Sequence, residues 1–134
     1  KDKIVEIGKS AFAWSYVKRI DMPDSVIQLG ESVFCDCKNL EYIRLSSSLQ
    51  TIEENTFKNC EKLNHVHIPE GVKKIKKDAF RYCKQLTDIY LPDSLEKIEE
   101  GAFAYSGFKT VVVPKQTVIA EGAFMENCQI IRRE

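Results

Sequence analysis

Six phenylalanines recur along the chain at a nearly constant interval, and this period constrains the fold more than any other feature. They are Phe12, Phe34, Phe57, Phe80, Phe103 and Phe124, with spacings of 22, 23, 23, 23 and 21 residues. A fixed period of this length is typical of a solenoid, in which each repeat forms one coil stacked on the preceding coil. A solenoid offers a long surface rather than an obligate pocket, so we expect binding rather than catalysis.

Other positions fall into register when the repeats are aligned on Phe. An aliphatic residue lies five positions before each Phe, and a Cys or Ser lies three positions after the first five. An apolar-x-apolar step follows, as in Ile43-x-Leu45, and its period of two predicts a short strand with one buried face. Proline follows this step in four of five copies and ends the strand. The segment around each Phe, such as Ser10-Ala11-Phe12, is expected to form a helical or 3₁₀ turn.

The strand motif L-x-x-I-x-L is that of leucine-rich repeats. The complete unit, I-x-x-x-A-F-x-x-C-x-x-L-x-x-I-x-L-P-x-x-L, closely resembles the Treponema-type, or BspA-like, leucine-rich repeat over essentially the whole chain. The resemblance implies an α/β solenoid, a right-handed superhelix of about six repeats of 21–23 residues. Its parallel β-sheet would form the concave face, with short helical or 3₁₀ turns opposite. We expect residues 1–134 to be a single domain and a fragment of a longer repeat array.

The balance of charges bears on the class of partner. The chain has 20 basic and 20 acidic residues, and this neutrality argues against a nucleic acid or an anionic membrane surface. No apolar run is long enough to span a bilayer, so membrane insertion is not expected.

Three of the five cysteines, Cys37, Cys60 and Cys83, share one repeat position. We expect them to stack as a buried column of small apolar side chains with weak hydrogen-bonding capacity. Disulfides between neighbouring coils are the alternative, because parallel coils lie roughly 5 Å apart. A metal site is disfavoured because no C-x-x-C pair occurs. Cys35 replaces a basic residue of other repeats and is expected to be exposed.

Charged pairs recur at one position before the Phe turn. Glu53-Glu54, Lys76-Lys77 and Glu99-Glu100 would stack as acidic, basic and acidic rungs. We interpret them as ion pairs that set the register, since a slipped register would bring like charges together. A charged docking strip is the alternative. Lys74 and Lys97 stack like on like, so the pattern is imperfect.

The strand residues that flank the central aliphatic residue point out of the sheet. In the middle repeats these positions carry Tyr, Arg, His and Asp, and Tyr and Arg are enriched at binding hot spots. We predict a partner-binding site there, the sheet patch, with ordinary solvated surface as the alternative. Its residues are Arg19, Tyr42, Arg44, His65, His67, Asp88 and Tyr90.

The same residues give weak support for metal binding and none for catalysis. His65 and His67 share a strand face and could hold zinc with Asp88, but Arg44 beside His67 would oppose a cation. The favoured interpretation is that Asp88 accepts a hydrogen bond from His65. No nucleophile elbow, phosphate loop or paired carboxylate motif occurs. We therefore predict no catalytic residue, no metal ligand and no cofactor.

Proteins that resemble this family are commonly bacterial surface adhesins. The resemblance therefore implies a non-catalytic protein–protein interaction module of a bacterial cell-surface or secreted adhesin-like protein, binding host matrix or cell-surface proteins through the concave sheet. The alternatives are a structural spacer that presents another domain, or a scaffold arm of an intracellular or effector protein. We expect a monomer, with end-to-end association through the open coil ends as a risk.

Overall fold

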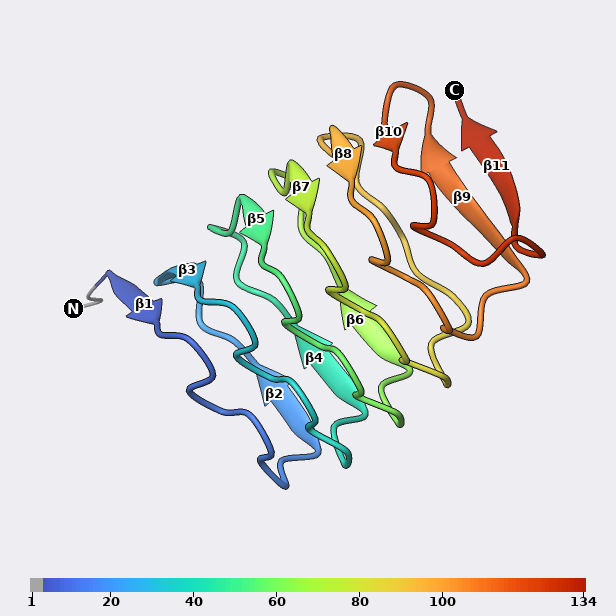
Figure 1. Ribbon diagram of the computed structural model, residues 1–134. Coiled ribbons are helices and arrows are strands. Elements are labelled where there is room, and N and C mark those ends of the chain that lie inside the picture. The colour runs from blue at the N-terminus through green and yellow to red at the C-terminus, as the bar shows by residue number, and fades with distance from the viewer. Residues whose placement is uncertain (1–3) are drawn as a thin grey trace.

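The computed structural model describes residues 4–134, which wind into a stack of coils running from one terminus to the other (Figure 1). Short strands alternate with turns, and every strand pair is parallel. The strands are β1 (Val5–Ile7), β2 (Arg19–Asp21), β3 (Val26–Leu29), β4 (Tyr42–Arg44), β5 (Thr51–Ile52), β6 (His65–His67), β7 (Lys74–Ile75), β8 (Lys97–Ile98), β9 (Thr110–Pro114), β10 (Val118–Ile119) and β11 (Gln129–Arg133).

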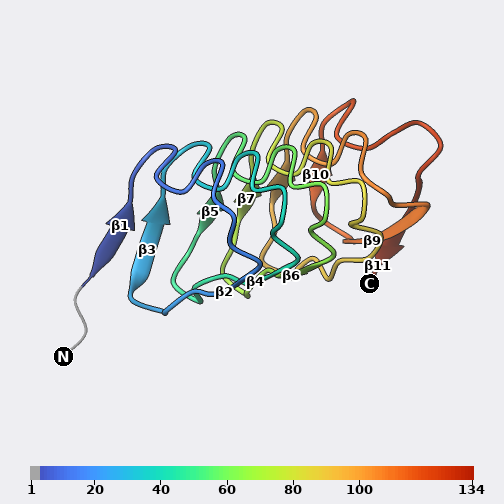
Figure 2. The same cartoon turned by 90° about the horizontal axis from the view of Figure 1, so that it is seen from below.

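Two sides of the stack carry the strand ladders. The apolar-x-apolar segments form the ladders β2-β4-β6 and β9-β11, and the return segments form β1-β3 and β5-β7-β8-β10. Figure 2 shows β2, β4 and β6 along the lower edge and rounded loops along the upper edge. Ile20 pairs with Ile43, and Ile43 with Val66, so the observed register equals the alignment of the sequence repeats.

The phenylalanines form a continuous column through the core, as the period predicts. Neighbouring rings have centroids 5.0 to 5.8 Å apart and lie within 14° of parallel. The middle rings, from Phe34 to Phe103, are at most 2% exposed, whereas Phe12 in the first coil is 48% exposed. Ring stacking adds to the burial of apolar surface, so each coil depends on the rings above and below it.

The helical or 3₁₀ turn predicted at each Phe is not confirmed, because residues 4–134 contain no helix and the first five repeat Phe residues lie in tight turns. In the first coil the Ala13 amide donates to the Ser10 carbonyl (3.1 Å), but the Phe12 amide donates to Val33 of the next coil (2.9 Å). Along this segment, backbone amides therefore donate alternately to a carbonyl of the same turn and to a carbonyl of the next coil. In the first five coils, the residues two before and two after the Phe adopt positive φ, for example Ser10 at 58° and Trp14 at 68°. This alternation produces paired tight turns and is incompatible with a helical run.

The cysteine column is buried as predicted, and its thiols have a definite role. Cys37, Cys60 and Cys83 are 0% exposed. Each thiol donates to the carbonyl of the Phe in the preceding coil, at 3.1 to 3.2 Å. All five cysteines are free, so the alternative of disulfides between coils is not realised in the structure. Cys35 was expected to be exposed; it is half-buried, and its thiol donates to Asp36 Oδ2 at 3.1 Å.

Candidate functional site

The first column of the sheet patch is a stack of three side chains on neighbouring strands. The Arg19 guanidinium on β2 lies 4.2 Å from the ring centroid of Tyr42 on β4. The Tyr42 ring stacks on His65 of β6, with centroids 5.0 Å apart and planes 9° apart. Arg19 and His65 are exposed and Tyr42 is half-buried. Because the parallel ladder places these residues in direct register, the stack presents a cation and two flat rings to solvent.

The second column centres on Arg44. Its guanidinium lies 3.8 Å from Asp21 and 3.5 Å from Asp24, and it donates to the Met22 carbonyl at 3.2 Å. The pKa of Asp24 is lowered, first by hydrogen bonds from Ser47 and then by Arg44. Arg44 is therefore held close to the strand end by groups of the preceding coil, rather than extending freely from the sheet.

The ladder opens after β6, where the repeat pattern predicts one more strand at residues 88–90. Among the described residues, the amides of this segment donate to no backbone carbonyl, and no strand is formed. Ile89 is half-buried, whereas the equivalent Ile43 and Val66 are buried. A hollow of about 210 Å³ separates the two coils. It is lined by His65, Val66, His67, Ile68, Asp88, Ile89 and Tyr90.

The opening changes the predicted geometry of the site. The predicted hydrogen bond from His65 to Asp88 does not occur within residues 4–134: the two residues lie on either side of the hollow, and His65 stacks on Tyr42 instead. His67 lies in register with Arg44, as predicted. No group of three or more metal-ligating side chains occurs within residues 4–134.

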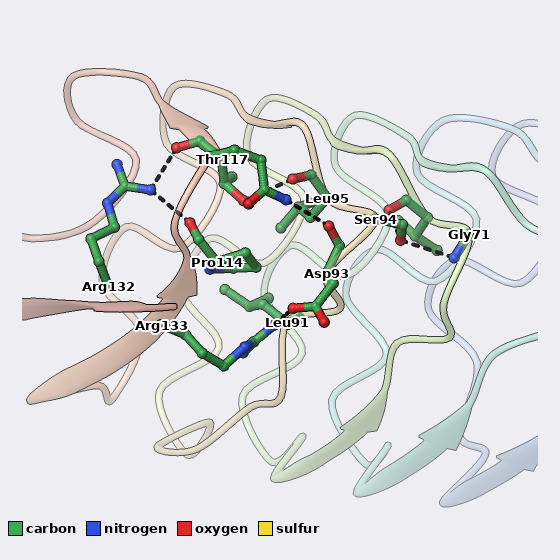
Figure 3. Close-up of polar contacts among 11 residues, drawn as sticks. Gly71, Leu91, Asp93, Ser94, Leu95, Pro114, Thr117, Arg132 and Arg133 are labelled. Atoms are coloured by element: carbon green, nitrogen blue, oxygen red, sulfur yellow. Dashed lines mark hydrogen bonds and ion pairs between the residues drawn. The ribbon is translucent and has the colours of Figure 1, made fainter.

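An arginine that the sequence analysis did not identify contacts the coil that carries residues 88–90. Arg133 on β11 crosses the intervening coil and donates to the Leu91 carbonyl at 2.7 Å and to Asp93 at 2.6 Å (Figure 3). Its guanidinium also lies 4.7 Å from the Tyr90 ring centroid. Arg132 beside it donates to the carbonyls of Pro114 and Thr117 at 2.9 and 2.6 Å. The repeat pattern does not predict this contact, because the contact depends on the length and direction of one long side chain that spans two coils.

The sheet patch therefore divides into two parts. Arg19, Tyr42 and His65 form one contiguous stack, with Arg44 and His67 in the adjacent column. Asp88 and Tyr90 lie across the opening on the next coil, where Tyr90 contacts Arg133.

The charged rungs lie on the return segments, away from the sheet patch. Lys76 Nζ is 3.2 Å from a Glu53 carboxylate oxygen, and the hydrogen bond raises the pKa of Lys76. Glu99 acts on Lys76 only through longer-range attraction. Lys74 and Lys97 are paired in register on β7 and β8, as the sequence predicts.

Comparison with known proteins identifies the family. The family model of the BspA type leucine rich repeat region matches residues 5–131 in six copies. The chain belongs to the BspA-type leucine-rich repeat family. The resemblance seen in the sequence is thereby confirmed. BspA-type repeats form a scaffold suited to protein–protein interaction.

Solved structures share this BspA-type fold. A leucine-rich repeat protein from Bacteroides ovatus is 26% identical, with a TM-score of 0.85 over 95% of this chain and 37% of its own. A leucine rich cell surface protein from Faecalibacterium prausnitzii is 32% identical, with a TM-score of 0.73 over 96% of this chain and 30% of its own. The leucine rich repeat protein of T. pallidum is 25% identical, with a TM-score of 0.76, over 94% of this chain and 66% of its own.

The BspA-type chain thus spans roughly a third of the first two of these structures. No curated protein sequence matches it. Across residues 4–134, no helix has the length and apolar character that crossing a bilayer requires.

Proposed function

We propose that this chain is a non-catalytic protein-binding module of a bacterial cell-surface or secreted adhesin-like protein, and that it binds its partner through the sheet patch. The observation that carries the proposal is the stack of Arg19, Tyr42 and His65 across three strands.

Folding does not require these side chains. They point away from the buried face of the ladder, where Ile20, Ile43 and Val66 fill the core. Short polar side chains would solvate this face equally well. Flat side chains that stack on one another lose little further rotamer freedom when a partner covers them, so the stack is preorganised for binding.

The cell-surface location is supported by one relative in particular. The Faecalibacterium prausnitzii protein, 32% identical, is described as a leucine rich cell surface protein. The chain spans only 30% of that structure, which supports our proposal that it forms one domain within a longer repeat array.

The direct test is binding of the immobilised chain to a panel of extracellular matrix proteins, including fibronectin and fibrinogen. The wild type would be compared with a variant in which five patch residues are replaced by Ser or Thr. These are Tyr42, Arg44, His65, His67 and Tyr90. The matched control replaces Lys74 and Lys97 by Ser, because both are exposed on the other ladder.

Binding that the patch variant loses and the control keeps would support the proposal. Binding that survives in the patch variant would place the interface elsewhere. If wild type and both variants bind no panel protein, the result would favour the alternative, a structural spacer that presents another domain, over a binding site in this chain. Circular dichroism of all three proteins would verify that the substitutions leave the fold intact.

A further inference from the structure

The turns at the phenylalanines form a second surface of the solenoid. This surface carries aromatic residues whose backbone φ is positive, a conformation that is unfavourable for large side chains. The residue two after the Phe has positive φ in the first five coils. Asp36 and Asn59 fill this position in the second and third coils, and Asn and Asp tolerate it best among residues with a side chain. Trp14, Tyr82 and Tyr105 occupy the same position at φ of 68°, 65° and 59°. Large aromatic residues are strained there, and such strain is retained mainly at functional sites.

Two of these aromatic residues are neighbours and form a platform. The Tyr82 and Tyr105 rings stack with centroids 5.0 Å apart and planes 12° apart. The Arg81 guanidinium lies 5.2 and 5.1 Å from the two centroids, and Asp78 pairs with it at 3.5 Å. Tyr105 remains 45% exposed. The platform is thus fixed by its neighbours yet open to solvent.

A groove of about 530 Å³ begins beyond Tyr105, where the sixth coil carries no ring to continue the stack. Tyr82 does not line the groove, so the groove lies on the other side of Tyr105. Its floor includes Gly101 and Gly122, which occupy the position two before the Phe. A Cβ at Gly122 would meet only one atom within 4 Å, at 3.9 Å, so the missing side chain leaves the groove open.

The rim of the groove combines charged, amide and apolar groups. Glu100, Glu126 and Asn127 are exposed there, beside the partly exposed Met125, and Arg81 also lines the groove. The Arg81 guanidinium is paired with Asp78, so the two carboxylates disfavour an anionic ligand, and Arg81 would repel a cation at the Tyr105 ring. Carboxylates accept hydrogen bonds from hydroxyls, and an amide both donates and accepts them. An apolar platform with a few polar groups that fix orientation is typical of small-ligand sites.

We propose that this groove binds a neutral pyranose unit of a glycan. One apolar face of the sugar ring covers the outer face of Tyr105, and its hydroxyls donate to Glu100 and Glu126. The site lies on the turns and is independent of the sheet patch, so neither proposal rests on the other.

The test is titration of the whole chain with methyl glycosides of glucose, galactose, mannose and N-acetylglucosamine, followed by the NMR signals of the tyrosine rings. Tyr105→Asn removes the ring and introduces the residue that the third coil already uses at this backbone conformation. We expect it to weaken binding by about tenfold or more. Trp14→Asn is the matched control, because it makes the same change in the first coil, and it should bind like the wild type.

A second variant tests the groove without touching the platform. Gly122→Asn places in the sixth coil the residue that the third coil has at the equivalent position, Asn55, which also has positive φ. Its side chain should occupy the groove and weaken sugar binding. Absence of saturable shifts with any glycoside at millimolar concentration would overturn the proposal, as would binding unaffected by Tyr105→Asn. Saturable shifts with p-cresol but not with sugars would assign the groove to an aromatic side chain of a protein partner instead.

Discussion

At the scale of single residues, one repeat position shows why the sequence alternates between Cys and Ser. Cys60 Sγ donates to the Phe34 carbonyl at 3.1 Å, and Ser106 Oγ donates to the Phe80 carbonyl at 3.0 Å. The position requires a small side chain with one hydrogen-bond donor, and both residues provide it. This donor ties the Phe turn of each of the first four coils to the coil that follows it.

Burial of these thiols makes stability depend on pH. Desolvation raises the pKa of Cys60 and Cys83 above the ordinary value of 9.0. As the pH rises above 9.0, the unfolded chain releases these protons while the folded chain keeps them. The stability that the buried thiols contribute is therefore fully present below pH 9.0. Above that pH, the free energy of unfolding decreases by about 1.4 kcal/mol per thiol per pH unit.

The measurement is urea unfolding between about pH 8 and about pH 10. The wild type should lose stability more steeply than the double variant Cys60→Ser, Cys83→Ser, because a serine hydroxyl does not titrate in this range. Lysine and tyrosine side chains titrate in both proteins, so their effect on the free energy of unfolding cancels when the two pH dependences are compared. Equal slopes for the two proteins would contradict the prediction.

At the scale of the structural element, the Phe column connects the coils. Phe80 is 0% exposed and stacks between Phe57 and Phe103, with both centroids 5.0 Å away. Phe80→Ala should cost about 3–5 kcal/mol, because it removes apolar burial and leaves a cavity. This is a large part of the stability of an ordinary domain, about 5–15 kcal/mol.

Thermal and urea unfolding would measure this loss. Phe12→Ala is the control, because the same substitution is made at a ring that is 48% exposed and stacked on one side only. It should cost clearly less than Phe80→Ala. A melting temperature unchanged by Phe80→Ala would show that the column does not hold the stack together.

The open ladder at residues 88–90 predicts uneven protection of backbone amides. Tyr42 to Arg44 on β4 are paired on both sides, with β2 and with β6. The amides of Asp88, Ile89 and Tyr90 donate to no backbone group among the described residues. Hydrogen exchange should therefore be fast at 88–90 and slow within β4, because exchange requires opening of a hydrogen bond only where one exists. Equal protection of the two segments would mean that the ladder is continuous in solution.

At the scale of the whole molecule, the sequence predicts what repeats and misses what is local to one coil. The columns of Phe, aliphatic and Cys residues follow from period and hydrophobicity, and the structure confirms them. The sequence analysis missed the positive-φ turns, although Asn, Asp and Gly residues at these two positions favour that conformation, as at Asn55 and Asn59. At Tyr82 and Tyr105 the residue type gives no such signal. Their shared offset from the Phe was nevertheless visible in the aligned repeats. The opening at 88–90 and the reach of Arg133 depend on side-chain packing between particular coils, which a repeat pattern does not encode.

The two ends of the described stack determine how copies of this chain would associate. β11 has β9 on one side only, and Ile130 and Ile131 on it are 40% and 44% exposed. At the other end, Phe12 and Trp14 are 48% and 67% exposed. The two surfaces differ, so two copies would join head to tail. Such a contact leaves one free surface of each kind, and further copies would add to give chains of increasing length rather than a defined dimer.

We therefore predict that the 134-residue chain sediments as a monomer at low concentration and as a broad distribution of larger species at high concentration. Ile131→Lys should shift this distribution toward the monomer, because a charge on an edge strand opposes pairing with another chain. Val112→Lys is the matched control, since Val112 is similarly exposed, at 41%, but lies on β9, which is covered by β11 on one side and followed on the other by the preceding coil rather than by solvent. Analytical ultracentrifugation of the three proteins would distinguish the cases. A defined dimer, or equal effects of the two lysines, would show that association does not proceed through the β11 end.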